Sequence, residues 1–522
     1  MKGLMNFKKM EKIQKLLEYY GPIFRILLLT LMPLIMCYIV CLRDGISLDD
    51  IYLPNSKWND EVLYYKITEG VAAYNGPLGY FGYNGSSAQA GHFGAWSPVI
   101  FVFYIIWSKA FGWSLLSPVY CNILLMTIAM LVFAVFVRPT KKQTLFLCLF
   151  YASCSILTRY VLSGMTEMTI YAILIMFIGI AVKACRSAED VFKVRYVIAL
   201  NSLAVFLVLM RPYWILLFVV PAWYWYKKGR RKAIFFEIII SIVSIVSYFF
   251  VAHRYCAQFL FPIINLDWLK LLFTDPVGGI YNILHILVSS VWNLLQSMGE
   301  GIIQGEPIGA MYAVFMLILI YFICCIKNCP GEDRVKQGYS YGLVSFLIML
   351  LAIFYLYDLK VGSRHLLGFI LAFIMIFPLI ERKGKSPLLF LTMFIWLFCV
   401  RASDEYTYQL PVRTEVKEAE IAQGMEELER AEILDRRTEN AWDNTIIWLY
   451  SDETNLDFTY LYALPKGMGI NLCYKDYVVA NFDQLKAKYI ITNAGEEIDL
   501  LCKDKKKELK AEYANVHIWK LR

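Results

Sequence analysis

Long unbroken runs of apolar residues dominate roughly the first 400 positions of the chain. A run of about 20 residues, wound as a helix that rises 1.5 Å per residue, spans the roughly 30 Å hydrocarbon core of a bilayer. A soluble protein would show apolar stripes instead, so the pattern indicates a polytopic α-helical membrane protein. About eleven transmembrane helices are predicted, near residues 22–42, 117–137, 143–160, 166–185, 196–211, 213–226, 234–252, 309–326, 338–357, 365–380 and 387–401.

Positive residues between the apolar runs predict the orientation of the chain. Lysines and arginines cluster in short loops, at 138–142, 183–195, 227–232, 327–336 and 382–385. Because such loops stay on the cytosolic side, we expect a multi-pass protein of the plasma membrane, with a cytosolic N-terminus and an extracytoplasmic C-terminal domain. The net charge of +8 arises largely from these loops and does not indicate a nucleic-acid partner.

One further apolar stretch, at 96–112, is not counted as a span. If it crossed the membrane, every later loop would change sides and the basic cluster at 227–232 would lie outside. We therefore expect a helix that lies in the interface or dips into the protein, with Trp96, Trp107 and Trp113 as interfacial anchors.

Three large pieces of chain are then expected outside the membrane. They are a first external loop at about 43–116, a segment at about 253–307 with an amphipathic or re-entrant stretch at 280–298, and the whole tail. The cytosolic loops are short by comparison, so the chemistry of the protein is expected on the outer face.

The tail differs in character from the transmembrane domain of residues 1–401. Residues 402–440 read as a charged helical connector, and residues 441–522 as a small extracytoplasmic α/β domain. In that domain, β-like runs alternate with helix-compatible stretches. The predicted strands lie near 446–450, 468–473, 488–492 and 516–521, and the helical stretches at 455–463, 481–487 and 496–511.

The positions of the cysteines indicate neither a metal site nor a disulfide framework. Most of the 13 cysteines lie inside the apolar runs at no regular spacing, where cysteine behaves as a small apolar residue. Cys473 and Cys502, in the tail, could form a disulfide. The tail contains no Gly-rich phosphate loop and no metal-ligand spacing.

The adjacent carboxylates Asp60 and Glu61 are the strongest sign of chemistry in the chain. They open a predicted helix just outside the first span, and acids are favoured in a first helical turn by about 0.3–1 kcal/mol, which could explain one of them. Successive helical residues diverge by about 100°, so only one of the pair can face a given cleft. A carboxylate facing a partly dehydrated cleft would suit a general base.

The aromatic, glycine-rich run at 74–85 follows in the same loop, with His92 and Trp96 beyond it. Such a surface could stack on sugar rings or shield a cleft. The competing interpretation is an irregular loop whose aromatic side chains sit at the membrane interface.

Ionisable residues also mark the external ends of the predicted spans. Arginine offers a bidentate fork for phosphate, so two of these residues near one cleft could hold a lipid phosphate. For any single residue, anchoring at lipid headgroups is an equally valid explanation. The set consists of Arg159, Glu167, Arg211, Asp358, Lys360, Arg364 and His365.

These features together resemble the GT-C class of integral-membrane glycosyltransferases, of a bacterial type. The resemblance covers most of the chain in architecture, but only short stretches in motif. Those stretches are Asp60-Glu61 with Tyr64, the interfacial segment 96–114, Gly164-Met165-Thr166-Glu167-Met168, and Gly362-Ser363-Arg364-His365-Leu366-Leu367. An arginine-tyrosine pair before a proline is usual in the late span, so the match at Arg364-His365 is partial.

The resemblance implies inverting transfer of a sugar from a polyprenyl-phosphate donor to an extracytoplasmic acceptor, which could be a cell-envelope polymer, a lipid or a protein. Asp60 would be the general base and Glu61 would position the acceptor or the base. Donor-phosphate binding is assigned to Arg364, Arg211 and His365, where it would stabilise the leaving group. Substrate binding is assigned to Glu167, Tyr64, His92 and Trp96. The resemblance implies no definite cofactor; a divalent cation could take part, but the loop carries no dedicated motif for one.

Two other functions compete with this interpretation. A transporter or flippase of a lipid-linked saccharide would place charged or broken positions near mid-span, whereas the charges here lie at span ends. A non-catalytic envelope assembly protein would instead tolerate Asp60→Asn without effect.

Overall fold

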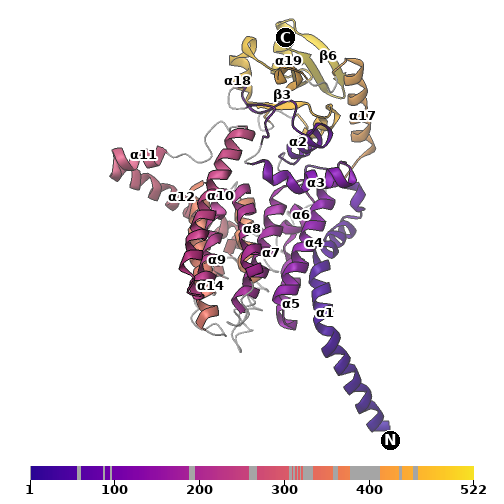
Figure 1. Cartoon of the computed structure of the whole chain (residues 1–522). Helices are drawn as coiled ribbons and strands as arrows, with labels where there is room; N and C mark the ends of the chain where they lie inside the picture. Colours follow the sequence, from indigo (N-terminus) through magenta and orange to yellow (C-terminus); the bar gives the residue numbers. More distant parts are fainter. Residues whose placement is uncertain are drawn as a thin grey trace.

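The computed structural model describes residues 2–55, 60–85, 89–94, 97–186, 194–257, 267–304, 309, 312–313, 316–317, 319–320, 333–356, 363–376, 412–433, 438–450 and 456–522. The predicted span near 387–401 lies outside these residues, as do Trp96, Asp358, Lys360 and most of the predicted span near 309–326. Figure 1 shows a helical bundle with a sheet domain at one end.

The helices of the bundle follow the apolar runs. Those helices are α1 (Lys2–Asp44), α4 (Ser117–Val137), α5 (Lys141–Ser153), α6 (Ser155–Val161), α7 (Glu167–Arg186), α8 (Val194–Met210), α9 (Val219–Lys227), α10 (Arg231–Tyr255), α14 (Asp333–Leu356) and α15 (Ser363–Ile376). Helix α7 is the most enclosed of the long helices and packs closely on α4. A methyl group on Gly179 would lie 2.9 Å from the Cα of Phe133, so only glycine allows this approach.

Five helices in the described part of the chain are long and apolar enough to cross a membrane. They are Tyr20–Asp44, Ser117–Val137, Glu167–Arg186, Arg231–Tyr255 and Pro276–Ile303. Of the other predicted spans that are described, the one near 338–357 lies in α14, which has 24 residues, whereas α8 and α15 are shorter, with 17 and 14 residues, and two more are broken. One is split at Cys154 into α5 and α6, and another begins as the 3-10 helix η3 (Pro212–Phe218). The membrane class follows from these helices, whereas the number of eleven spans stays a prediction.

The apolar stretch that was kept out of the span count forms a short 3-10 turn, η2 (Pro98–Phe101), followed by α3 (Val102–Phe111). Helix α3 has 10 residues, about 15 Å, which is half the thickness of the hydrocarbon core. Gly112 ends it with a positive φ of 83°. Figure 1 shows α3 lying across the end of the bundle, beneath the sheet domain.

The segment at about 253–307, which was predicted to lie outside the membrane, contains α11 (Asp267–Thr274) and α12 (Pro276–Ile303), and α12 is one of the five helices long and apolar enough to span. Helix α12 runs unbroken for 28 residues, which is longer than the stretch expected from the sequence. Asp275 caps it by accepting a hydrogen bond from the N–H of Gly278 at 3.1 Å. Figure 1 shows α11 projecting from the side of the bundle.

The tail builds a sheet that also takes in part of the first external loop. The strand order is β2-β1-β4-β3-β5-β7-β6, with β1, β4, β3 and β5 parallel. The tail supplies β3 (Thr445–Leu449), β4 (Gly469–Cys473), β5 (Tyr489–Asn493), β6 (Glu508–Tyr513) and β7 (Val516–Lys520). The loop supplies β1 (Tyr80–Tyr83) and β2 (Gln89–Ala90), which the sequence interpretation did not include in the sheet.

The predicted helix at 496–511 is wrong in its second half. Helix α19 (Glu497–Asp504) is followed by Lys506 with a positive φ of 53°, and the chain then returns as β6 against β7. Charged residues at 503–508 looked compatible with a helix, but the alternation of buried and exposed positions in β6 fits an edge strand. The expected helix at 481–487 is reduced to the 3-10 turn η8 (Phe482–Gln484).

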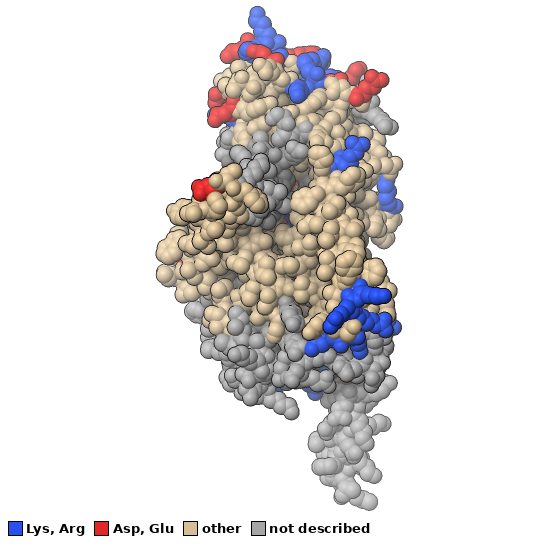
Figure 2. All heavy atoms as spheres, turned by 60° about the vertical axis from the view of Figure 1, so that its left-hand side comes forward, with Lys and Arg blue, Asp and Glu red and all other residues tan. Residues whose placement is uncertain are grey.

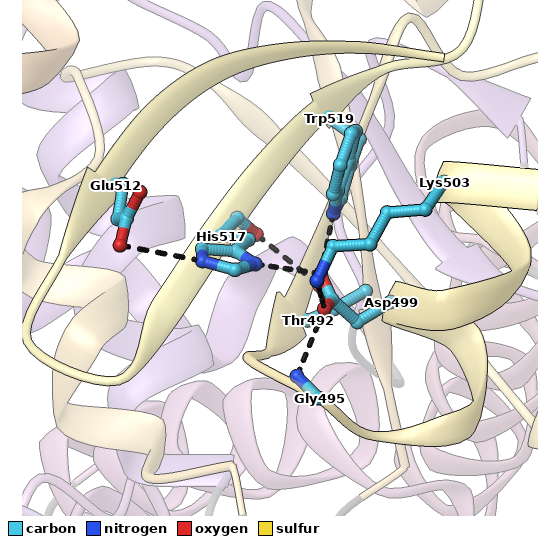
Figure 3. A network of polar contacts seen from close by, with 7 residues as sticks. All are labelled: Thr492, Gly495, Asp499, Lys503, Glu512, His517 and Trp519. Carbon is cyan, nitrogen blue, oxygen red and sulfur yellow. Dashed lines mark hydrogen bonds and ion pairs between the residues drawn. The ribbon is translucent and has the colours of Figure 1, made fainter. Parts of the chain in front are cut away.

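A polar network holds the far half of the sheet domain together (Figure 3). The carboxylate of Asp499 is fully buried and accepts hydrogen bonds from the Trp519 indole at 2.8 Å, the N–H of Gly495 at 2.8 Å and Lys503 at 2.8 Å. The His517 ring lies 2.7 Å from it. Each bond ends within the domain, so the network reads as structural. Cys473 and Cys502 lie in the same small core as free thiols.

The sheet domain rests on α2 (Asp60–Tyr74), the helix that begins with the acid pair. The buried ammonium of Lys66 pairs with Glu69 and donates a hydrogen bond to the carbonyl of Leu464 at 2.8 Å. Tyr462 packs edge-on against Tyr65, with ring centroids 5.1 Å apart. The tail therefore fixes the position of α2 over the bundle.

Exposed positive charge is concentrated at one end of the bundle. Arg230, Arg231 and Lys232 are exposed at the start of α10. On the face in Figure 2, positive side chains gather at the end of the bundle remote from the sheet domain, and a broad belt between the two ends carries almost no charge. A belt of this kind suits lipid, and the basic end suits the cytosolic side.

Candidate functional site

Asp60 stands at the first position of α2, where the helix meets the bundle. Its Oδ2 accepts a hydrogen bond from Nη1 of Arg364 at 2.6 Å, across 304 positions of sequence. The Asp60 side chain is 31% exposed and that of Arg364 is 15% exposed. Of the two acids, Asp60 is therefore the one that solvent or a substrate can reach.

Glu61 is turned the opposite way, into the protein. Its side chain is fully buried, with Oε1 accepting from the N–H of Asn55 at 3.0 Å and Oε2 from the N–H of Gly164 at 2.7 Å. A methyl group on Gly164 would lie 3.2 Å from the Cβ of Glu61, so a glycine suits this approach. Glu61 thus clamps the start of α2 to the turn before α7.

The clamp extends into a wider set of hydrogen bonds. The side-chain amide of Asn55 donates to the carbonyl of Leu162 at 2.9 Å, and the backbone carbonyl of Asn55 accepts from Nε of Arg159 at 2.7 Å. Asn122 donates to the carbonyl of Ser163 at 2.8 Å. These bonds explain why a short turn of small residues holds one shape beside the acid pair, and they place Arg159 in a structural contact.

Asp60 is the outer end of a row of alternating charges. Nε of Arg364 lies 3.7 Å from Oε1 of Glu167, and Nη2 of Arg211 donates to the same oxygen at 3.1 Å. Glu167 is 2% exposed and Arg211 is 1% exposed, so the row runs from the bundle interior to the accessible Asp60. Four elements, α2, α15, α7 and the start of η3, supply one residue each.

Local sequence explains how two of these residues reach the row. Pro212 disfavours helical geometry in the residue before it, and Arg211 accordingly has φ −146° and ψ 115°. Helix α8 therefore ends at Met210, which leaves Arg211 at the junction. Arg364 lies in the first turn of α15, and the Tyr171 hydroxyl donates a hydrogen bond to its carbonyl.

The other predicted site residues are distributed unevenly. Tyr64 is buried one turn after Asp60, edge-on to Phe101 at 5.5 Å, and its burial raises the pKa of its phenol. His365 is buried next to Arg364. His92 lies at the outer end of α10 instead, where burial and the charge of Arg254 lower its pKa. Among the described contacts none joins His92 to the row of charges.

No three His, Cys, Asp or Glu side chains gather as a metal-binding group within the described residues. Asp60 and Glu167 are both paired with arginines, and Glu61 accepts from two backbone N–H groups. Such an arrangement is chemically able to exchange a proton and to bind an anion, because one accessible carboxylate lies beside a guanidinium that a second carboxylate also attracts.

Sequence analysis did not find Asn55 and Tyr171, which help to hold the site, and it named Gly164 only as part of a family motif. Asn55, Gly164 and Tyr171 act through a side-chain amide, a backbone N–H and a phenol on separate segments. Gly164 had a signal, because it lies in the turn before a span, whereas Asn55 and Tyr171 carried none.

The sequence matches no family model and no curated protein. Two solved structures of the Archaeoglobus fulgidus oligosaccharyltransferase resemble the fold. The form tethered to an acceptor peptide with the NVT sequon has a TM-score of 0.50 at 10% identity, over 96% of this chain and 74% of that one. The apo form has a TM-score of 0.51 at 10% identity, over 95% and 74%. The expected GT-C architecture is thereby confirmed, whereas a bacterial type stays a prediction.

Proposed function

We propose that this chain is a membrane glycosyltransferase that moves a sugar from a polyprenyl-phosphate donor to an extracytoplasmic acceptor, with inversion at the anomeric carbon. The observation that carries the proposal is the contact of Asp60 with Arg364, backed by Glu167 and Arg211. A base and an anion-binding group stand side by side at the end of a GT-C bundle, as sugar transfer from a lipid phosphate requires.

Arg364 would receive the donor phosphate. Its guanidinium is partly accessible, and Glu167 lies behind it at 3.7 Å. Arg211, hydrogen-bonded to Glu167 at 3.1 Å, adds positive charge deeper in the bundle. A guanidinium offers several N–H donors in a plane, so Arg364 can turn a donor toward phosphate oxygens while Glu167 still holds it. The head of the lipid would then lie at the membrane end of the site.

Asp60 would act on the acceptor. When the phosphate draws Arg364 away, the carboxylate becomes free to accept the proton of an acceptor hydroxyl. The hydroxyl oxygen attacks the anomeric carbon from the side opposite the phosphate and forms the new C–O bond. The bond from that carbon to the phosphate oxygen breaks, and its electron pair leaves on the lipid phosphate, which the arginines stabilise. Asp60 then releases its proton to water.

The location of the site supports an extracytoplasmic reaction. The row of charges ends at α2, beneath the sheet domain, while the basic residues at the start of α10 lie at the opposite end of the bundle (Figures 1 and 2). If the basic end is cytosolic, the site opens on the outer side, which is where lipid-linked sugars meet envelope acceptors.

The test uses the purified full chain in lipid nanodiscs with radiolabelled polyprenyl-phosphate sugars of several kinds. We expect release or transfer of the labelled sugar by the wild type. Asp60→Asn removes the base and should lower the rate by about 10²–10⁴-fold. Arg364→Gln removes an anion-binding group and should lower it by about 10²–10³-fold.

Two surface variants serve as matched controls. Asp504→Asn changes an exposed acid on α19, and Arg430→Gln changes an exposed arginine at the end of α17 (Glu415–Arg430) that pairs with Glu427. Both should keep the wild-type rate. Full activity in Asp60→Asn would remove this residue from the mechanism. Movement of the intact donor across a membrane, with no cleavage, would favour a flippase.

A further inference from the structure

We propose that Tyr83, Tyr450 and Tyr474 form a binding platform for the sugar rings of a saccharide acceptor. The three residues, called here the tyrosine platform, follow or end the parallel strands β1, β3 and β4. They belong to the first external loop and to the tail, so no single stretch of sequence displays them. The inference rests on the proposed function, for which it names the acceptor class.

A close contact joins the chain just before β4 to α2, the helix that begins with Asp60. A methyl group on Gly70 of α2 would lie 3.3 Å from the Cα of Gly467, just before β4. From Gly70 back to Asp60 is ten helical residues, about 15 Å. From Gly469 to Tyr474 is five extended residues, about 17 Å. The start of β4 therefore lies against α2, and β4 is about as long as the stretch of α2 from Gly70 back to Asp60.

Pairing places the other two tyrosines at the same edge. Tyr83 is the register partner of Leu472 in β4, and Leu449 is the partner of Cys473, so Tyr450 and Tyr474 follow adjacent strand ends. Rings of Tyr450 and Tyr474 lie 5.2 Å apart between centroids, at 43°. Carboxyl ends of neighbouring parallel strands are the usual place for a ligand in an open sheet.

Electrostatics agrees with this geometry. Burial is the main cause of the raised pKa of Tyr83, and the next cause is the negative charge of Asp60. Tyr450, Arg364 and Tyr474 also act on the same phenol. Tyr83 is therefore close enough to both Asp60 and Arg364 to feel their charges, while all three tyrosines keep part of their surface exposed.

The chemistry of the platform favours a saccharide. An aromatic face carries negative charge density and attracts the weakly positive C–H groups on one side of a sugar ring, while sugar hydroxyls stay in water. An extended peptide would instead seek a free strand edge, and the edge strand on this side, β2, has only two residues. The platform is formed by the sheet domain and the arginines that would hold the donor by the bundle, so we assign the acceptor to the platform.

Saturation-transfer NMR on the full chain in nanodiscs tests this proposal directly. The probes are maltotetraose, cellotetraose and chitotetraose, with a serine- and asparagine-containing hexapeptide as the alternative class. We expect at least one saccharide to bind the wild type and to lose about tenfold or more in affinity in Tyr450→Ala/Tyr474→Ala. Tyr450→Phe and Tyr474→Phe keep the rings and should bind like the wild type.

The controls separate this proposal from the proposed function. Tyr226→Ala changes an exposed tyrosine in α9 at the basic end and should not alter binding. Donor cleavage with water as acceptor should stay within about twofold in the alanine variants, because Asp60 and Arg364 are unchanged. Binding of only the peptide, of no saccharide, or of saccharide equally in the alanine variants would overturn the platform. Loss of donor cleavage in the wild type would overturn the enzyme proposal instead, while the NMR result still decides the platform.

Discussion

Replacing Glu61 with glutamine tests whether the two adjacent acids have separate roles. The wild-type carboxylate is fully buried and accepts two backbone hydrogen bonds, at 3.0 and 2.7 Å, from Asn55 and Gly164. Glutamine offers one oxygen and one NH₂ group, so one of the two backbone N–H groups must face a donor. Loss of a charge-assisted bond and one unsatisfied buried N–H should cost about 2–4 kcal/mol locally.

Hydrogen exchange measures this cost where it arises. If opening of the clamp controls exchange, the amides of Asn55 and Gly164 should exchange about 30- to 1000-fold faster in Glu61→Gln than in the wild type. Mass spectrometry of peptides that cover 53–62 and 162–168 reports both sites. Sugar transfer should also fall, because α2 no longer holds Asp60 in place, but added donor should not restore it.

Asp60→Asn is the matched comparison, since it changes the neighbouring residue by the same chemical step. Asp60 is 31% exposed and its bond is to a side chain, so protection of Asn55 and Gly164 should stay within about threefold while activity is lost. Unchanged protection in Glu61→Gln would refute the clamp. Equal loss of protection in both variants would show that the two acids share one structural role.

Three further changes probe the framework. Gly164→Ala places a methyl group 3.2 Å from the Cβ of Glu61 and should lower the free energy of unfolding by about 1–2 kcal/mol, which a lower thermal midpoint would show. An unchanged midpoint would mean that the turn can shift to make room for the methyl group. Lys66→Met removes the buried ammonium that donates to the carbonyl of Leu464, and this should lower the free energy of unfolding by about 2–4 kcal/mol. Proteases should then cleave the chain between α2 and the tail faster. An unchanged cleavage rate would mean that the aromatic contacts alone hold α2 against the sheet domain. In Asp499, burial would raise the pKa, but hydrogen bonds from Lys503, Gly495, His517 and Trp519 outweigh it and hold the pKa well below its usual range. Its stabilisation is therefore present above a pH of about 4 and lost as the pH falls toward the folded pKa, so exchange of β5 and β7 should quicken in acid. Asp499→Asn should be less stable at pH 7 and less sensitive to acid; equal acid sensitivity in both proteins would contradict the assignment.

Much of the fold could be predicted because the signals are local. The helices α4, α7, α8 and α10 lie within a few residues of the predicted spans. An apolar run must satisfy its backbone hydrogen bonds internally, and a helix does so without help from distant segments. The strands β3, β4, β5 and β7 were also found from short apolar runs, whereas β6 was missed because an edge strand tolerates charged residues.

The candidate site could be predicted only in part from the sequence. Ionisable residues at span ends are costly and often functional, and on this basis the sequence analysis could select Asp60, Glu167, Arg211 and Arg364. The helical rotation of about 100° per residue predicted that Asp60 and Glu61 point in different directions, but it did not predict which acid faces outward. That choice depends on Asn55 and Gly164, whose backbone N–H groups look like any others in the sequence.

By itself, the sequence determined that this chain is a polytopic membrane protein with an α/β tail and a set of charges at helix ends, because hydropathy and charge act residue by residue. The tertiary structure alone decided that α2, α7, η3 and α15 join four of those charges into one row. It also decided that a loop of the N-terminal half completes the sheet of the tail. Ion pairs across 304 positions and strand pairing across nearly 400 arise from packing, which local pattern does not encode.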